Sequence, residues 1–539
     1  MRKVVLAGLM VALLMPVGLM AQTNEDLMKQ IEALKQQLQS LEAKVAAQEK
    51  AVAQEQAAPA PAPALEKEVS NLDARLSKVE VKTSEDRINW GGDLRVGYGY
   101  QNWHINPYQQ FSGFNPQTHM PMFQQVPGQD WNNSMDWSLR MRLTMNAKVN
   151  DNLKFMGRLT MYQLYGGADV PVFNGSPNTV LDSFDSASVP NSDVLHVERA
   201  LMVYHFTNIP FSFAIGRMNT SDGPPLEIRN ESERDGTPMA IMVNAEVDGV
   251  HAEYGLKDLG FPDGTTIGMC AGVGYEAGFG GGGQTAESYT MTPFGMARIN
   301  GMRDSKVIGL IYDMPLMWMA GNTVNSAELI LGYNRFNDMT DIPYGALINF
   351  PIPGPYAQPS PQYVTATKNL GDMDQYGLTW EHHIGDNFVY FVSGGYIKSH
   401  PNGQVSAYGF GGLLGDPNHS QTGSAYYTGV RWKATPKWTL GAEFNHGSKR
   451  WYTFTPSAGE ESDKLAARGD VWEGYVHWNF NKNVMLKMGY IHYDYSTAYS
   501  GWQIAPTNLD SLNLGNNPQL FYPFPKTVKN AYVMLEARF

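Results

Sequence analysis

Cysteine is nearly absent from this chain of 539 residues, since Cys270 is its only copy. A single thiol excludes an intrachain disulfide and a Cys-x-x-Cys-His haem attachment. Long apolar runs are missing too, because beyond residue 21 no stretch approaches the roughly twenty apolar residues that a spanning helix needs. These absences exclude a helical membrane protein, and any electron transfer would depend on a partner protein.

Motifs for metal binding and nucleophilic catalysis are also missing. The sequence contains no His-Glu-x-x-His and no Gly-x-Ser-x-Gly, and the glycine run 280–283 is not followed by Lys-Ser/Thr. We therefore expect no enzymatic activity, no metal and no cofactor. Basic residues are outnumbered by 52 acidic ones to 40, a formal charge of -12, which argues against nucleic-acid binding.

What is present begins with an export signal. Arg2 and Lys3 precede an apolar run that ends before Pro16, and Ala21 marks the step to polar sequence. This order predicts a secretory signal peptide over residues 1–21. Its cleavage would leave 38 basic residues against 52 acidic ones and a formal charge of -14.

A helical period follows the signal. Apolar residues recur at alternating steps of four and three, at Leu27, Ile31, Leu34, Leu38, Leu41, Val45 and Val52. This spacing predicts a coiled coil over residues 22–56 and self-association through it. An Ala/Pro linker, residues 57–64, interrupts the heptads, and a second coiled-coil segment over 65–83 resumes them.

From about residue 88 the apolar period changes to two. The clearest case, residues 135–149, alternates strictly and is longer than the usual globular strand of about five or six residues. We expect an all-β transmembrane barrel over residues 84–539, with about 16 antiparallel strands and 14 or 18 as alternatives. The expected strands are 88–100, 134–149, 153–165, 194–207, 211–218, 246–256, 265–275, 305–314, 326–336, 374–385, 388–398, 424–434, 437–449, 470–480, 484–495 and 528–539.

The connections between these strands alternate between short and long, as the periplasmic turns and external loops of bacterial barrels do. An Asp-Gly pair normally indicates a hairpin, so Asp248-Gly249 suggests splitting its strand in two. The split would place the Gly-rich segment 276–304 on the periplasmic side. We therefore keep one strand there and assign residues 239–245 to the preceding loop, where they could form a helix.

The final strand alternates between apolar and polar residues and stops at Phe539. It resembles the closing strand of Gram-negative outer-membrane barrels, in which a terminal Phe serves as an assembly signal. The parity of the strands pairs it with strand 88–100, which would close the ring.

Alternation also fixes which charges face the lumen, since a charge on the lipid face would cost roughly 2 to 4 kcal/mol at midplane. The first three strands carry a set of basic residues on the inward side. We expect this basic wall to line a pore, and it consists of Arg95, Arg140, Arg142, Lys148, Lys154 and Arg158.

The third long loop, residues 219–244, is acidic. It carries Asp222, Glu227, Glu231, Glu233 and Asp235. In general porins the loop at this position folds into the lumen opposite an arginine cluster, and by this resemblance we expect a constriction here. The alternative is a solvated surface loop, with the arginines paired locally to Asp93 and Asp136.

Several stretches resemble a family of bacterial outer-membrane porin-like proteins that is catalogued only as a domain of unknown function. They are residues 86–95 (Asp-Arg-Ile-Asn-Trp-Gly-Gly-Asp-Leu-Arg), 139–162, 216–225 and 248–250. The resemblance implies a pore-like barrel behind an N-terminal coiled coil, and it supplies no substrate or functional residues.

Two classes of function follow from these features. The first is a porin, a passive channel for small hydrophilic solutes or ions, embedded in outer-membrane lipid and trimeric through the barrel and a periplasmic coiled coil. The second is architectural: a protein that tethers the membrane to peptidoglycan, or a barrel that sheathes an electron-transfer cytochrome.

Overall fold

The computed structural model describes Lys35 and most of the chain beyond residue 87. The described ranges are 88–114, 116–117, 121–165, 192–219, 222–236, 238–244, 246–274, 288–292, 295–299, 305–339, 368–405, 411–454, 464–498, 505–509 and 524–539. The expected signal peptide, both coiled-coil segments and the linker lie outside these residues, apart from Lys35. Those four assignments stay predictions.

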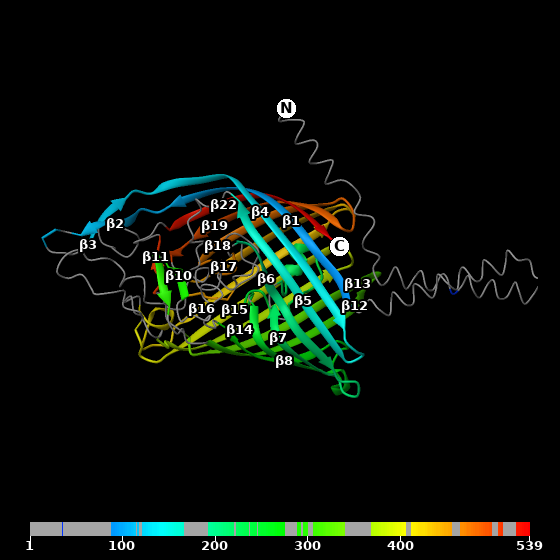
Figure 1. The fold of residues 1–539 in the computed structure, drawn as a ribbon. Helices are drawn as coiled ribbons and strands as arrows, with labels where there is room; N and C mark the ends of the chain where they lie inside the picture. The colour runs from blue at the N-terminus through cyan, green and yellow to red at the C-terminus, as the bar shows by residue number, and fades with distance from the viewer. Residues whose placement is uncertain are drawn as a thin grey trace, which may run out of the picture. The chain divides into compact units, whose positions relative to one another are not determined.

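Sixteen antiparallel strands form one closed barrel (Figure 1). They are β1 (Ile88–Ile105), β4 (Gln129–Lys148), β5 (Leu153–Tyr165), β6 (Ser192–His205), β7 (Phe211–Asn219), β8 (Glu246–Gly255), β9 (Thr266–Gly274), β12 (Ser305–Ala320), β13 (Thr323–Asn337), β14 (Gly371–Ile384), β15 (Phe388–Pro401), β16 (Thr422–Lys433), β17 (Trp438–Gly447), β18 (Gly469–Asn479), β19 (Val484–Tyr495) and β22 (Pro525–Arg538). The predicted strand number is confirmed.

The ring closes between the first and last strands. β1 pairs antiparallel with β22, with Asp93 opposite Arg538 and Tyr98 opposite Val533. Figure 1 shows the red β22 beside the blue β1. The closing partner expected from parity is therefore the one observed.

The alternation of connection lengths is also confirmed. The turn between β12 and β13 holds only Gly321 and Asn322, so these strands run further than the 305–314 and 326–336 expected. Asp248 and Gly249 lie inside the single strand β8. The segment 238–244 forms turns, and the helix of this loop is instead α5 (Leu226–Asn230).

Three small hairpins outside the wall were not predicted. They are β2 (Tyr108–Phe114) with β3 (Pro121–Val126), β10 (Ser288–Thr292) with β11 (Gly295–Ile299), and β20 (Thr497–Ala498) with β21 (Thr507–Asn508). Two 3₁₀ turns, η2 (Lys257–Leu259) and η3 (Leu413–Gly415), complete the described elements. Within the part of the chain that is described, no helix is long and apolar enough to cross a membrane.

The two faces of the wall differ as the alternation predicts. Large apolar side chains are exposed on the outer face, among them Trp90, Trp137, Leu310 and Trp472. Tyr98 and Trp137 of neighbouring strands meet there edge to face, with ring centroids 5.0 Å apart. An exposed apolar band of this kind fits a lipid environment.

The main hydrophobic core lies on the inward side of β12–β16, where the third loop packs against the strands. The loop contributes Leu226, Ile228 and residues 239–243, and the loop after β17 adds Trp451, Tyr452 and Phe454. Much of the barrel interior is therefore filled by the chain itself.

Candidate functional site

The arginines of the first barrel strands face inward and are buried. Arg140 and Arg142 of β4 and Arg158 of β5 are all less than a tenth exposed. They alternate with the outward Trp137, Leu139 and Met141, so strand geometry alone puts them on one wall. Lys148 and Lys154 follow the same alternation near the strand ends, and their side chains are exposed.

Carboxylates on neighbouring strands neutralise part of the charge of this basic wall. Arg140 donates to Asp93 at 2.7 Å, and Arg95 donates to Glu536 of β22 at 2.9 Å. The local pairing considered as an alternative is thus correct for Arg140 and Asp93. The side chain of Asp136, the other partner considered, lies outside the described part of the structure.

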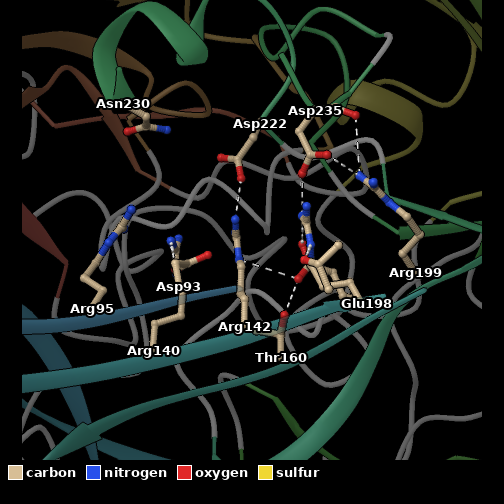
Figure 2. Close-up of polar contacts among 12 residues, drawn as sticks. Asp93, Arg95, Arg140, Arg142, Thr160, Glu198, Arg199, Asp222, Asn230 and Asp235 are labelled. Atoms are coloured by element: carbon tan, nitrogen blue, oxygen red, sulfur yellow. Dashed lines mark hydrogen bonds and ion pairs between the residues drawn. The ribbon is translucent and has the colours of Figure 1, made fainter. Parts of the chain in front are cut away.

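The third long loop, residues 219–244 (hereafter loop L3), folds into the lumen and meets the same wall. Arg142 donates to Asp222 at 2.8 Å, and Arg199 of β6 donates to Asp235 at 2.6 Å. Arg158 also pairs with Asp235. Figure 2 shows the two aspartates reaching down from the loop toward the arginines below them. We call these contacts the aspartate latch.

The charge state of the latch follows from its surroundings. Burial alone would raise the pKa of Asp235, but Arg158 and Arg199 outweigh burial and lower this pKa to about 2. Asp222 behaves likewise, since Arg142 and Arg140 lower its pKa against the effect of burial. Both carboxylates therefore stay ionised at neutral pH. The stability that Asp235 contributes is full above its ordinary pKa of 3.8 and is lost as the pH falls through about 2.

The other end of loop L3 is bound to strands β18 and β22. His477 and the side-chain amide of Asn479 hydrogen-bond the carboxylate of Glu231 at 3.0 Å and 3.2 Å. Arg538 donates to the backbone oxygens of Asn230 and Glu231, both at 2.7 Å. Glu231 thus anchors the loop to the wall near the barrel seam.

A third set of contacts joins loop L3 to β12, β13 and β16. Arg234 pairs with Asp313 at 2.7 Å and also with Glu328. Arg431 of β16 donates to the backbone oxygen of Ile228 at 2.9 Å. In the strand order of the ring β6 and β16 lie eight positions apart, on opposite sides of a sixteen-stranded barrel. Because the loop binds Arg199 and Arg431, it crosses the lumen.

Glycines in the wall give the loop a place to pack. Met239 and Met242 lie against Gly332 of β13 and Gly377 of β14. A Cβ at Gly332 would come within 2.6 Å of the Met239 methyl carbon. A larger residue at either position would force the side chains of Met239 and Met242 to move.

A buried ion cluster lies beside the anchored end of the loop. Lys464 binds both Glu443 and Glu473, the latter at 2.8 Å. Arg229 of loop L3 donates to Glu473 at 3.0 Å, and the Tyr532 hydroxyl donates to the same carboxylate at 2.5 Å. The loop is thus joined to the wall through charges with almost no access to water.

The acidic residues of loop L3 therefore do not act as one group. Asp222 and Asp235 form the latch, Glu231 forms the anchor, Glu227 lies beside Glu381 and Arg234 inside the barrel, and Glu233 is exposed. The expectation of five acids facing one basic wall is wrong for three of them. The reason is that a loop crossing the lumen presents its sides to different strands.

Glu227 supports a prediction about pH. Burial raises its pKa to about 7 from an ordinary 4.5, against the lowering effect of Arg234. Its neutral form is favoured in the folded protein, so the stability it contributes is full below pH 4.5 and is lost as the pH rises through about 7. We expect the unfolding free energy to fall by up to about 3 kcal/mol between pH 5 and pH 8.

The measurement is the urea midpoint at the two pH values. Because the carboxyl groups of Glu381 and Glu328 lie near Glu227 and share its protons, the Glu227→Gln variant should lose part of this dependence. Glu233→Gln, which changes an exposed acid on the same loop, should keep all of it. An equally steep dependence in Glu227→Gln would show that another group is responsible.

Strand alternation does not predict that two adjacent residues beside the latch, Glu198 and Arg199, both face the lumen. Glu198 and Arg199 are adjacent on β6, yet both are buried, at 0% and 6% exposure. The pairing of β5 with β6 passes from Arg199 directly to Val197, so Glu198 is the extra residue of a β-bulge. The bulge turns both side chains inward. Glu198 then lies 3.6 Å from Arg142 and 3.3 Å from Arg158.

The described residues contain no group of three or more His, Cys, Asp or Glu side chains arranged to hold a metal ion. Phe539, the expected assembly signal, follows β22 and is 60% exposed. Its role stays a prediction.

Residues 130–539 match the family described as "Protein of unknown function (DUF3373)". The chain belongs to this family. The match spans three of the four stretches on which the resemblance rested, and residues 86–95 precede it. No curated protein matches the sequence.

Several solved structures are similar to this barrel. OmpT, an outer membrane protein of Vibrio cholerae, has 12% identity and a TM-score of 0.38, covering 84% of this chain and 97% of its own. OprB of Pseudomonas putida has 8% identity and a TM-score of 0.41, covering 86% and 97%. The outer membrane channel DcaP of Acinetobacter baumannii has 13% identity and a TM-score of 0.35, covering 84% and 97%.

Proposed function

We propose that this protein is an outer-membrane porin, a passive diffusion channel for small hydrophilic solutes or ions. The observation that carries the proposal is loop L3, which is bound across the lumen of a closed barrel between charged walls. A barrel of about 16 strands is wide enough to leave an aqueous channel. A loop across it narrows the passage and lines it with charge, which is how pores discriminate among solutes.

The test is reconstitution of the purified protein in planar bilayers. A diffusion channel should give ohmic conductance steps, and liposomes containing it should swell in small sugars and not in large ones. A correctly folded barrel that inserts and passes neither ions nor sugars would contradict the proposal.

The architectural alternatives receive less support. A barrel that sheathes a cytochrome needs an open lumen, and here the chain packs Met239, Met242 and Trp451 into that space. A peptidoglycan tether would depend on residues 22–83, and it would give loop L3, bound across the lumen, no function. We expect no enzymatic activity, because the sequence contains none of the motifs for nucleophilic catalysis or metal binding considered above.

The assembly we propose is a homotrimer in outer-membrane lipid, joined through the barrels and a periplasmic coiled coil. Deleting residues 22–83 should lower the number of subunits in the native assembly while leaving the barrel folded, because the heptads of three chains would no longer pair. Native mass spectrometry in detergent measures the number of subunits directly. A deletion variant with as many subunits as the full-length protein would show that the heptads are dispensable for assembly.

A further inference from the structure

A pocket remains between loop L3 and the wall next to the barrel seam. Loop L3 contributes Arg229 and Asn230, and the facing strands contribute Arg95, Ser138, Lys487 and Tyr532 among others. Figure 2 shows Asn230 above the side chain of Arg95, and both residues line the pocket. The pocket thus lies where loop L3 leaves space along the seam side of the lumen.

Lys487 is the exceptional residue of this pocket. Its side chain is 7% exposed. Among the described residues no carboxylate lies within ion-pair distance of its ammonium group and none accepts a hydrogen bond from it. Its contacts are with two aromatic rings, whose centroids lie 4.8 Å (Tyr475) and 5.8 Å (Tyr532) from Nζ. Such contacts compensate a buried ammonium only in part.

The charges around Lys487 leave a positive excess. Five basic groups line or adjoin the pocket, and the three carboxylates that pair with four of them cannot balance the set. The basic groups are Arg95, Arg229, Lys464, Lys487 and Arg538, and the carboxylates are Glu443, Glu473 and Glu536. The carboxylate of Glu231, next to Arg538, adds one negative charge to this set. The remaining excess of one positive charge, in a space of low dielectric, attracts anions.

We propose that this pocket is a binding site for a small oxyanion, a phosphate- or carboxylate-bearing solute, which Lys487 holds with help from Arg229 and Arg95. The planar guanidinium groups and the ammonium donate to oxygens of one acceptor from three directions. The inference rests on the proposed channel, because it places a selective anion site on the route past loop L3. Solutes bearing one such group are the class this channel favours.

The experiment measures binding separately from transport. Full-length protein in detergent is titrated calorimetrically with sodium phosphate and with sodium succinate, and the same preparation is examined in planar bilayers. We expect saturable binding of at least one anion. Lys487→Gln should weaken it by about tenfold or more. Lys487→Arg should retain it, and Lys398→Gln, an exposed lysine on β15, should bind as the wild type does.

Each outcome separates the two proposals. Ohmic conductance with no saturable binding overturns the anion site and leaves the channel. Binding that depends on Lys487 in a barrel without conductance supports the site and overturns the channel. If Lys487→Gln keeps its heat-modifiable fold and the wild-type affinity, the site is wrong whatever the conductance.

Discussion

Replacing Asp222 and Asp235 together by asparagine is expected to raise the single-channel conductance severalfold and to shift ion preference toward anions. The two carboxylates hold loop L3 against Arg142, Arg158 and Arg199. Removing one partner of a buried ion pair costs about 3–5 kcal/mol, because the remaining charge has no compensation. Here Arg142 and Arg158 would share Glu198, and Arg199 would lose the carboxylate of Asp235. Moving the loop aside admits the water that these arginines need.

Planar-bilayer conductance and reversal potentials in a salt gradient measure both effects. The hydrophobic contacts of Met239 and Met242 with the wall remain, so the barrel should fold. Loop L3 should pivot about these contacts and move away from the arginines. Glu233→Gln is the matched control, because it removes an exposed acid from the same loop. Wild-type conductance and reversal potential in the double variant would mean that the latch does not set the width of the passage.

The second large effect is expected at Lys464. Its ammonium group lies between Glu443 and Glu473, and all three side chains are nearly inaccessible to water. In Lys464→Met the two carboxylates would face each other with only Arg229 between them. We expect the unfolding free energy to fall by about 3–5 kcal/mol, as for other broken buried pairs.

Urea titration of the reconstituted protein measures this loss. Adding Glu443→Gln to Lys464→Met should recover part of it, because one uncompensated charge disappears, and the non-additivity reports the coupling between the two residues. Lys398→Met, at an exposed position, should change the midpoint little. Equal midpoints for Lys464→Met and Lys398→Met would show that the buried cluster contributes no net stability.

The wall of the barrel was predictable because strand alternation is a local property. Each residue of β4 has its orientation fixed by its neighbours, so Arg140 and Arg142 could be placed inward from the sequence alone. Connection lengths then fixed the strand count and kept Asp248 and Gly249 in one strand. These inferences need no knowledge of distant contacts.

The contacts of loop L3 were predictable only in part. Its acidity and position indicated a loop in the lumen, but which acid meets which strand depends on the path of the loop across the barrel. The bulge at Glu198 could not be seen either, because a single extra residue leaves hydrophobic alternation looking almost regular. The direct ion pairs of Asp222 and Asp235 with the arginines were not predicted either.

The seam between β1 and β22 has a consequence for biogenesis. The paired residues Asp93 and Arg538 lie at opposite ends of the barrel sequence, so the wall cannot close before the whole chain has been delivered. The same last strand carries the Arg538 guanidinium that binds the backbone of loop L3. This contact of loop L3 therefore forms only when the last strand is in place, and a barrel without that strand would lack one of the anchors of the loop.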